Sequence, residues 1–317
     1  MKVLLPTSVP LDVTAPTGHD VVLVDYDVTV PVPDEHTDAE VLVAWGNTRA
    51  QLADSAQRLT SLRWIQALAA GPDVILAAGF APDVIITSGR SLHDGPVAEH
   101  ALGLVVAAVR RLDLMHDAQR AGRWARELGG VQSAEPSFFP GLGTVRGREV
   151  TIWGFGGIGQ RLAPLLAALG AHVVGVATRA GERSGFPVIT ETDLAERLAT
   201  TDILVMILPA TPDTEHSLDA TRLAQLPSRA WVVNVGRGST VDEEALDVAL
   251  RSGALAGAAL DVFEREPLVA DSPLWTTPNL IVTPHAAGGR PLDAAPLIER
   301  NLGAFLAGTA LVNEVTA

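Results

Sequence analysis

The sequence predicts an α/β protein with two doubly wound parallel-sheet domains. Its 317 residues exceed what one hydrophobic core usually supports, so two domains are expected. Short apolar runs typical of buried strands alternate with segments of helical periodicity over residues 1–90, and the alternation resumes at Glu149. A Pro- and Gly-rich stretch, residues 133–147, lies between the two series and is expected to be a loop.

The first series contains five short apolar runs that we interpret as strands. A helix is predicted between the third and fourth runs, because Leu52, Ala56 and Leu59 recur there at helical spacing. Since strands and helices alternate, the strands are expected to run parallel under a cover of helices. The five predicted strands are Val3–Leu5, Val21–Val24, Val41–Ala44, Trp64–Ala67 and Val84–Thr87.

One long helix is predicted next, over residues 93–124. Pro96 suits its first turn and Asp94 is a candidate cap. An apolar stripe at three- and four-residue spacing would face the core. The stripe consists of Val97, Ala101, Leu104, Val105, Ala108, Leu112 and Met115.

The second series has six apolar runs with helical segments between them. In order, the runs are "EVTIW", "HVVGVA", "DILVMILP", "AWVVNV", "GAALDVF" and "NLIVTP". The tail over residues 291–312 is again helical in pattern, and no linker is long enough to make it a third domain.

Composition excludes several function classes. A formal charge of −14 argues against nucleic acid or an anionic membrane as the main partner. No apolar stretch is long enough to span a bilayer and no signal peptide is recognisable, so a cytoplasmic location is expected. Without cysteine, and with Lys2 as the only lysine, thiolate, Schiff-base and P-loop chemistry are excluded, and no metal site is expected. The only tyrosine is Tyr26, and Val30 stands where a Tyr-x-x-x-Lys reductase needs its lysine.

A glycine pattern predicts a dinucleotide site. Gly154, Gly156 and Gly159 directly follow the strand "EVTIW" and open a helix. They would permit, in turn, a tight turn, close approach of a pyrophosphate, and close packing of strand and helix. The alternative is a glycine-rich turn that binds nothing. Because the pattern begins at residue 154, its Rossmann-type domain must follow another α/β domain or be inserted in it.

The next strand ends in residues that bear on cofactor choice. A carboxylate about 20 residues after such a pattern normally holds the ribose of NAD. Here Thr178 and Arg179 occupy that place, and Arg183 follows. Because a guanidinium can bind a 2′-phosphate bidentately, NADP(H) is predicted to be preferred over NAD(H). Alternatively, Arg179 is a loop cation and Glu182 reaches the ribose of NADH.

Three later strands end in polar residues that are candidates for catalysis. Arg237 lies in "NVGRG", Asp261 and Glu266 in "ALDVFEREP", and His285 in "VTPHAAGG". Ligands of open α/β sheets bind outside the carboxyl ends of the strands, so these residues are expected to share one crevice with the cofactor. Each alone could be a surface charge, a solvated turn or a structural histidine, whereas their order after a glycine pattern is far more specific.

The chain resembles the D-isomer-specific 2-hydroxyacid dehydrogenases over essentially its whole length. The resemblance implies a Rossmann-type cofactor domain, residues 94–288, inserted in a flavodoxin-like substrate domain, residues 1–93 and 289–317. It also implies hydride transfer between NAD(P)H and a small 2-keto acid to give a D-2-hydroxy acid, and a homodimer that pairs through the cofactor domains. The motifs that carry it are "WIQALAAGPD", "VAEHALGLV", "GFGGIG", "ILPATPDT", "NVGRG", "ALDVFEREP" and "TPHAAG".

The residue types suit this chemistry. Arg237 can bind the substrate carboxylate and polarise the carbonyl, while His285 serves as general acid. An ionised Glu266 would favour the protonated ring and hold it in place. Asp261 fits the role of holding the nicotinamide amide. The motif match implies further cofactor contacts at Gly157, Ile158, Leu208, Pro209, Thr214, Val235 and Gly236.

Substrate contacts are implied in the first domain. By motif match, the backbone N–H groups of Ala70 and Gly71 bind the carboxylate. Trp45 and Asn47, at the end of the third strand, are candidates to shape the pocket; alternatively, Trp45 is a core residue. Pro72 follows where the family usually has an apolar residue with a free N–H, so a contact that needs this donor is lost.

Other functions compete with this reading. A phosphoglycerate dehydrogenase-like activity is disfavoured by the lack of a C-terminal regulatory domain. A non-catalytic, cofactor-sensing protein that resembles the fold's transcriptional corepressors lacks the support of a basic surface or a long disordered tail. A carboxamide in place of Glu266 would have suggested formate dehydrogenase. Glyoxylate and hydroxypyruvate are the family's commonest substrates for chains of this length.

Overall fold

The computed structural model describes residues 1–129 and 143–315. The chain divides into two compact units, Met1–His93 with Gly289–Ala317, and Asp94–Gly288. Most of the predicted loop over residues 133–147 lies outside the described residues. No helix within the described ranges combines the length and the apolar character needed to cross a membrane.

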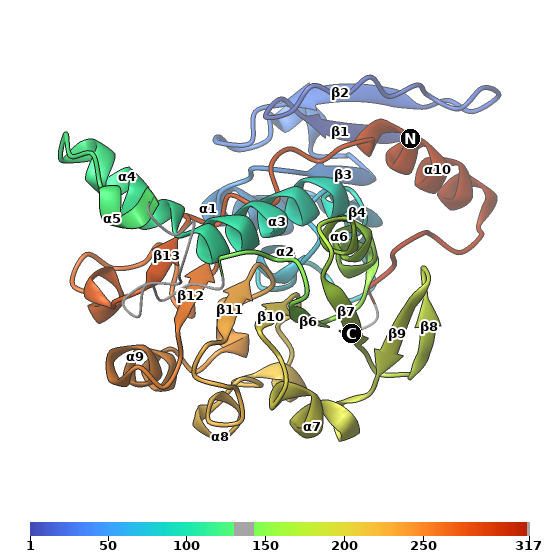
Figure 1. Cartoon of the computed structure of the whole chain (residues 1–317). Helices are drawn as coiled ribbons and strands as arrows, with labels where there is room; N and C mark the ends of the chain where they lie inside the picture. The colour runs from blue at the N-terminus through green and yellow to red at the C-terminus, as the bar shows by residue number, and fades with distance from the viewer. Residues whose placement is uncertain (130–142, 316–317) are drawn as a thin grey trace. The chain divides into compact units, whose positions relative to one another are not determined.

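The first unit is built on a five-stranded sheet whose order, β2-β1-β3-β4-β5, is that of flavodoxin-like folds (Figure 1). All neighbouring strands run parallel. The two central strands β3 and β4 are buried along their whole length, as expected for apolar runs in a parallel sheet covered on both faces. The strands are β1 (Lys2–Pro6), β2 (Val22–Tyr26), β3 (Val41–Ala44), β4 (Trp64–Ala67) and β5 (Ile85–Thr87).

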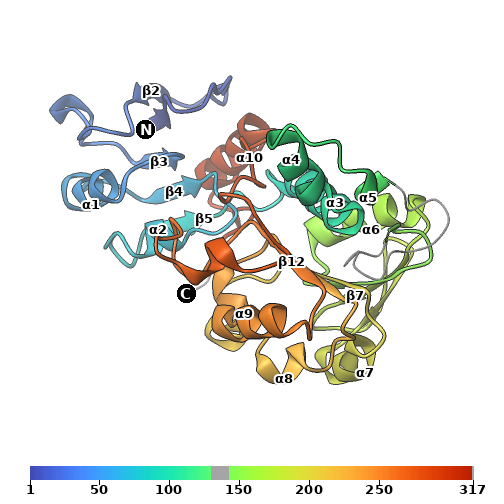
Figure 2. The ribbon, with the colours of Figure 1, turned by 60° about the vertical axis from the view of Figure 1, so that its left-hand side comes forward.

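Helices cover both faces of this sheet (Figure 2). Leu52 of α1 (Arg49–Arg58) packs into the core on one face. On the other face Ile298 and Leu302 of α10 (Ala294–Ala307) are fully buried, so this C-terminal helix forms part of the core of the first unit. The unit also contains the short helices η1 (Asp34–His36) and α2 (Asp73–Leu76).

The second unit is built on an eight-stranded sheet in the order β13-β12-β11-β10-β6-β7-β9-β8. Leaving out β8, the sheet is parallel and its first six strands in chain order follow the Rossmann arrangement. The predicted α/β fold class is thereby confirmed. The strands are β6 (Glu149–Trp153), β7 (His172–Val176), β8 (Gly181–Arg183), β9 (Phe186–Ile189), β10 (Ile203–Met206), β11 (Trp231–Asn234), β12 (Gly257–Leu260) and β13 (Leu280–Val282).

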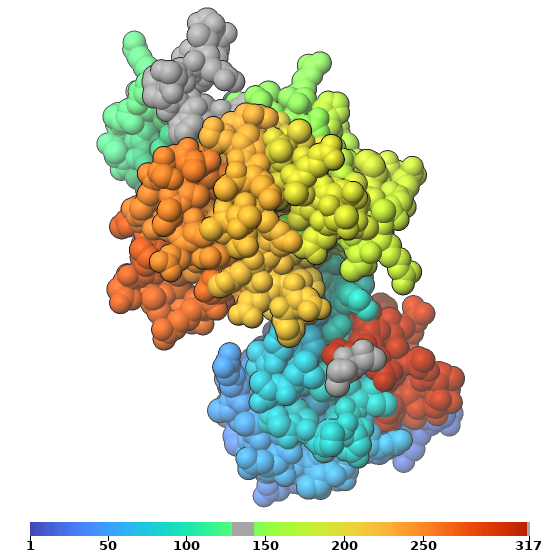
Figure 3. Space-filling view, turned by 90° about the horizontal axis from the view of Figure 1, so that it is seen from below, coloured from blue at the N-terminus to red at the C-terminus, as the bar shows by residue number. Residues whose placement is uncertain are grey.

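Two layers of helices enclose this sheet. On one face α3 (Asp94–Arg110) and α6 (Gly157–Ala168) pack against each other and share a core cluster with the strands (Figure 1). On the opposite face lie α7, α8 and α9, which form the yellow-to-orange surface of this unit in Figure 3. The remaining helices are η2 (Glu191–Asp193), α7 (Leu194–Leu198), η3 (Pro212–Thr214), α8 (Ala220–Leu223), η4 (Gly238–Thr240), α9 (Glu243–Ser252) and η5 (Pro273–Thr276).

The predicted single helix over residues 93–124 is wrong. The chain forms α3 and then α4 (Leu112–Arg120), followed by the short α5 (Arg126–Gly129), because Arg111 adopts a left-handed conformation with φ 53°. Its guanidinium is buried 5.4 Å from the ring centre of Trp231 and donates hydrogen bonds to Asp113. This buried anchor breaks the helix although the apolar stripe continues through it.

A second difference follows the strand β7. Strands β8 and β9 form an antiparallel hairpin in a gap between apolar runs where the sequence predicted no strand. Its turn places Ser184 and Gly185 at φ 53° and 81°, the left-handed pair that two-residue hairpins favour. The hairpin brings Arg183 back toward the glycine-rich turn that follows β6.

Candidate active site

The glycine-rich turn between β6 and α6 has the geometry of a phosphate cradle. Gly154 has φ 103°, and a Cβ there would collide with the carbonyl of Ile207. A Cβ on Gly159 would lie 3.2 Å from the carbonyl oxygen of Gly154, so strand and helix approach closely. Apart from its two neighbours in the chain, no atom of the described residues lies within 4 Å of a Cβ placed on Gly156, the N-cap of α6. The open backbone at this helix N-terminus fits the pyrophosphate of a dinucleotide.

Two further residues of the pattern stand at the start of α6. Gly157 lies against the carboxylate of Asp94, which would clash with any side chain at that position. Ile158 is partly buried and packs on the core cluster beneath the helix. Packing within the protein therefore limits which side chains fit at both positions, in addition to any contact with a ligand.

The end of β7 presents the residues expected to discriminate between cofactors. Thr178 and Arg179 are exposed there, and so is Glu182 on β8. Arg183 is engaged within the protein: Nη1 donates to the carbonyl of Phe155 at 3.0 Å, and Nη2 donates to the carbonyl of Arg179 at 3.2 Å. Arg183 thus braces the hairpin on the glycine-rich turn, whereas the guanidinium of Arg179 extends into solvent.

The next two strands of the sheet contribute an adjoining wall. After β10, Thr214 donates its hydroxyl to the carbonyl of Pro209 at 2.6 Å and closes a capping box with Thr211. After β11, Val235 is buried and Gly236 packs so closely that a Cβ would lie 2.6 Å from the carbonyl oxygen of Leu208. The predicted cofactor residues of these two segments therefore pack against each other.

A hydrogen-bonded acid and histidine lie beyond the neighbouring strands. Nδ1 of His285, just after β13, is 2.6 Å from Oε2 of Glu266, in the turn after β12. The other oxygen of Glu266 accepts the backbone N–H of Phe263 at 3.0 Å, which fixes the carboxylate. His285 is 48% exposed and Glu266 33%, so the pair is open to a reactant. With Nδ1 bound to Glu266, Nε2 remains free for proton transfer.

Arg237 lies at the same edge of the sheet. It lies in the turn that follows β11. Strands β11, β12 and β13 are parallel neighbours, so Arg237, Glu266 and His285 all follow the carboxyl ends of adjacent strands. Nη1 of Arg237 donates to the carbonyl of Gly236 at 2.8 Å. Its own carbonyl accepts the side-chain amide of Asn234 at 3.0 Å, which holds the turn in shape.

Asp261 is fully buried, and its carboxylate binds the loop that carries His285. Oδ1 accepts the Thr283 hydroxyl at 2.5 Å and the N–H of Ala286 at 2.9 Å, and Oδ2 accepts the N–H of Ala287 at 2.9 Å. Nε2 of His100, on α3, approaches Oδ1 to 3.3 Å.

Sequence reasoning missed His100. It lies three residues after Val97 and four before Leu104, on the face of α3 that the apolar stripe marks as buried. A polar residue on such a face needs a polar partner, and this was the signal available in the sequence.

A second missed cluster lies next to Glu266. Glu243 and Glu264 each accept the backbone N–H of the other, at 2.7 and 3.3 Å, and His216 contacts Glu264 at 2.9 Å. Burial raises the pKa of Glu243, and the charges of Glu264 and Glu266 act in the same direction. The turn that holds Glu266 is thereby fastened to the start of α9.

The predicted substrate contacts lie in the first unit, after two adjacent parallel strands. Trp45 follows β3 and stacks on His93, with ring centres 5.3 Å apart and planes 24° from parallel. Ala70 and Gly71 follow β4, just before α2. Asn47 donates to the Tyr26 hydroxyl and to Gln51, both at 2.8 Å, so it braces the strand end.

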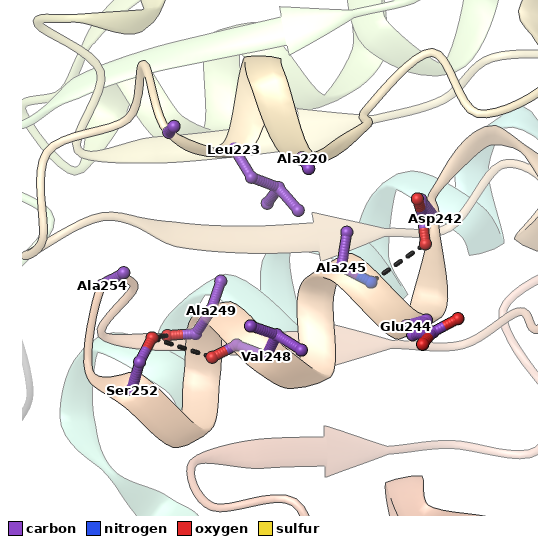
Figure 4. A pocket seen from close by; sticks show the side chains of 10 residues that line it. Ala220, Leu223, Asp242, Glu244, Ala245, Val248, Ala249, Ser252 and Ala254 are labelled. Carbon is purple, nitrogen blue, oxygen red and sulfur yellow. Dashed lines mark hydrogen bonds between the residues drawn. The ribbon is translucent and has the colours of Figure 1, made fainter.

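A separate hollow of about 430 Å³ lies between α8 and α9 in the second unit (Figure 4). Its wall is mainly apolar, including Leu223, Ala245 and Val248. None of the predicted catalytic or cofactor residues lines it, so this hollow and the candidate site are different places.

Known proteins resemble this chain in sequence and in fold. Residues 102–287 match the family described as "D-isomer specific 2-hydroxyacid dehydrogenase, NAD binding domain". The glyoxylate reductase of Thermococcus onnurineus is 34% identical over 289 residues, 90% of this chain and 81% of that protein. A D-isomer specific 2-hydroxyacid dehydrogenase from Xanthobacter autotrophicus Py2, solved with NADPH and MES, is 33% identical with a TM-score of 0.75, over 95% of this chain and 90% of that one.

The similarity extends beyond the region that the family match covers. A D-isomer specific 2-hydroxyacid dehydrogenase family protein from Aeromonas salmonicida is 30% identical with a TM-score of 0.80, and covers 99% of this chain and 98% of its own. The family match alone spans more than half of the sequence. The chain therefore belongs to the D-isomer-specific 2-hydroxyacid dehydrogenases, NAD(P)-dependent oxidoreductases that interconvert 2-keto acids and 2-hydroxy acids.

Proposed function

We propose that Arg237, Glu266 and His285 are the catalytic residues of a reductase that acts on a small 2-keto acid and prefers NADPH. The observation that carries this proposal is the 2.6 Å bond between His285 and Glu266, at the sheet edge that also carries Arg237. A bound nicotinamide supplies the hydride that reduces C2 of the keto acid. The protein must then bind the carboxylate and protonate the carbonyl oxygen.

Arg237 serves the first need, because its planar guanidinium can donate two parallel hydrogen bonds to a carboxylate. His285 serves the second need: Nε2 gives its proton to the carbonyl oxygen, and the ring is left neutral. Glu266 stabilises the charged ring before transfer and fixes its orientation through Nδ1. In the oxidation direction the same nitrogen takes the proton from the hydroxyl.

The preference for NADPH rests on Arg179. Its exposed guanidinium stands at the end of β7, where a carboxylate would select NAD. Arg183 supports the site indirectly, since its guanidinium braces the hairpin. The NADPH bound in the Xanthobacter autotrophicus relative agrees with this choice.

Further contacts and the assembly are also proposed. The backbone N–H groups of Ala70 and Gly71 are proposed to bind the substrate carboxylate, and Trp45 is proposed to be a wall of the pocket. The second unit is proposed to hold the cofactor. We also propose a homodimer that pairs through the second unit, where Trp124 is 89% exposed; light scattering would then give twice the mass of 33.2 kDa.

Initial rates with glyoxylate, hydroxypyruvate, pyruvate and phenylpyruvate, each with NADPH and NADH, test the proposal. We expect glyoxylate or hydroxypyruvate with NADPH to be fastest. His285→Gln, which keeps a polar side chain but cannot carry the proton, should reduce turnover by about 10²–10⁴-fold. Full activity of this variant would overturn the assignment of His285. NADH turning over faster than NADPH would overturn the role of Arg179 alone.

A further inference from the structure

We infer that His100 is a positioning residue that holds the loop carrying His285 in its active geometry. The inference rests on the proposed role of His285. His100 belongs to α3, far from that loop in sequence, and its ring contacts Thr283 and Asp261, not His285 or Glu266 themselves. It would act through Thr283 and Asp261.

The loop needs such support because its backbone is unusual. His285 has φ 53°, a left-handed conformation that a residue with a Cβ adopts only when its surroundings impose it. Its N–H donates to the carbonyl of Asp261 at 2.8 Å, and the N–H groups of Ala286 and Ala287 donate to the Asp261 carboxylate. The conformation of His285 therefore depends on the position of Asp261.

The carboxylate of Asp261 in turn needs hydrogen-bond donors at both of its oxygens. Its side chain is fully buried, and a buried carboxylate is costly unless each oxygen is hydrogen-bonded. The Thr283 hydroxyl donates its single hydrogen to Oδ1 at 2.5 Å. Nε2 of His100 lies 3.1 Å from the oxygen of that hydroxyl and 3.3 Å from Oδ1.

These distances determine whether His100 donates or accepts a hydrogen bond. Because the Thr283 hydrogen points at Asp261, the Thr283 oxygen can only accept from His100, so Nε2 of His100 carries a hydrogen. This N–H donates to Thr283, whose own hydroxyl donates to Asp261, and Nε2 itself lies 3.3 Å from Oδ1. It joins α3 to the carboxylate on which the whole loop is built, and losing it would loosen the position of His285 against Glu266.

A pair of variants separates this donor from the bulk of the ring. His100→Gln keeps an N–H donor at a similar reach, and His100→Leu removes the donor at a similar volume. We expect His100→Leu to lower kcat by about tenfold or more while the KM for the keto acid changes less than about twofold, since Arg237 is untouched. His100→Gln should retain most of kcat.

The split between kcat and KM, together with its rescue in His100→Gln, gives a readout that simple destabilisation would not move. Loss of the Nε2 hydrogen occurs in His100→Leu and not in His100→Gln, so only the former should show the fall in kcat at an almost unchanged KM. The substitution leaves the carboxylates of Glu266 and Asp261 in place.

NMR of the His285 ring in the free protein provides a measurement that needs no cofactor. The ring signal is identified by its absence in His285→Gln, and its chemical shift should change in His100→Leu and return toward that of the parent in His100→Gln. If His100→Leu does not fold, Thr283→Val, which removes the acceptor, should give the same shift. Where both variants fold, the double variant should lose no more than either one alone.

Two results would overturn the inference. One is a His100→Leu protein with the kcat and the His285 ring chemical shift of the parent. The other is an equal loss in His100→Leu and His100→Gln, which would make the shape of the ring, and not its donor, the cause. If instead His285→Gln keeps full turnover, the proposed catalytic role fails before His100 is considered.

Discussion

Replacing Arg179 with alanine is predicted to weaken the use of NADPH and to leave the use of NADH almost unchanged. The guanidinium is exposed at the end of β7, so its removal opens no cavity and breaks no recorded side-chain bond. A hydrogen bond to a charged group is worth about 1.5–3 kcal/mol. Because solvent screens an exposed pair, the lower value applies, and about 1.5 kcal/mol corresponds to roughly a tenfold loss.

The assay is kcat/KM for each cofactor at saturating keto acid, for the parent and for Arg179→Ala. The tenfold loss with NADPH should shrink as salt is added, because the contact is electrostatic. Arg183→Ala is the matched control: its guanidinium holds the carbonyls of Phe155 and Arg179, so both cofactors should suffer alike. Equal effects of Arg179→Ala on both cofactors would refute the reasoning. A selective loss of NADH use in Glu182→Gln would support the competing role of Glu182.

Three further predictions concern the acid, the glycine-rich turn and the buried glutamate. Glu266→Gln removes the charge 2.6 Å from His285, so kcat/KM for reduction should fall by about 10²-fold in steady-state assays. Gly154→Ala places a methyl group against the carbonyl of Ile207 at φ 103°, and urea unfolding should show a loss of about 3 kcal/mol. Gly156→Ala meets no atom of the described residues within 4 Å other than those of its two neighbours in the chain, so it should keep the unfolding midpoint and lose cofactor affinity in a fluorescence titration. Burial raises the pKa of Glu243 above its usual 4.5, so the native state holds this proton more tightly than the unfolded chain does. The group favours the fold below pH 4.5, and that advantage is lost as the pH rises through the raised pKa, so Glu243→Gln should be more stable than the parent at neutral pH and equal to it in acid.

Much of the fold could be predicted because its strands are buried. Val41–Ala44 and Trp64–Ala67 match β3 and β4 residue for residue, since a central parallel strand must be apolar on both faces. The helix break at Arg111 could not be predicted, because periodicity records which residues are apolar and not which φ the chain adopts. The stripe from Ala108 to Met115 continues through the break, while the buried guanidinium of Arg111 redirects the chain.

The hairpin of β8 and β9 was missed for a different reason. Its strands are short and half exposed, so they lack the apolar run that marks the other strands. The dipeptide Ser184–Gly185 was the available signal, because Gly and Ser are frequent in two-residue turns with positive φ. The hairpin bears on the proposed cofactor preference. The guanidinium of Arg183 is hydrogen-bonded within the protein, whereas Arg179 is exposed.

Within the site, the sequence reveals residue types at strand ends but not the direction of their hydrogen bonds. Arg237, Glu266 and His285 could be found because each lies in the short segment that follows a recognisable strand. Asp261 shares that position, yet its carboxylate is buried and receives donors from Thr283, Ala286 and Ala287. An ionised carboxylate is the side chain that accepts at both oxygens without offering a donor of its own, so the loop requires an acid here on structural grounds. Through the backbone, the Asp261 carboxylate determines the conformation of His285, the proposed catalytic histidine, and this dependence can be seen only in the folded chain.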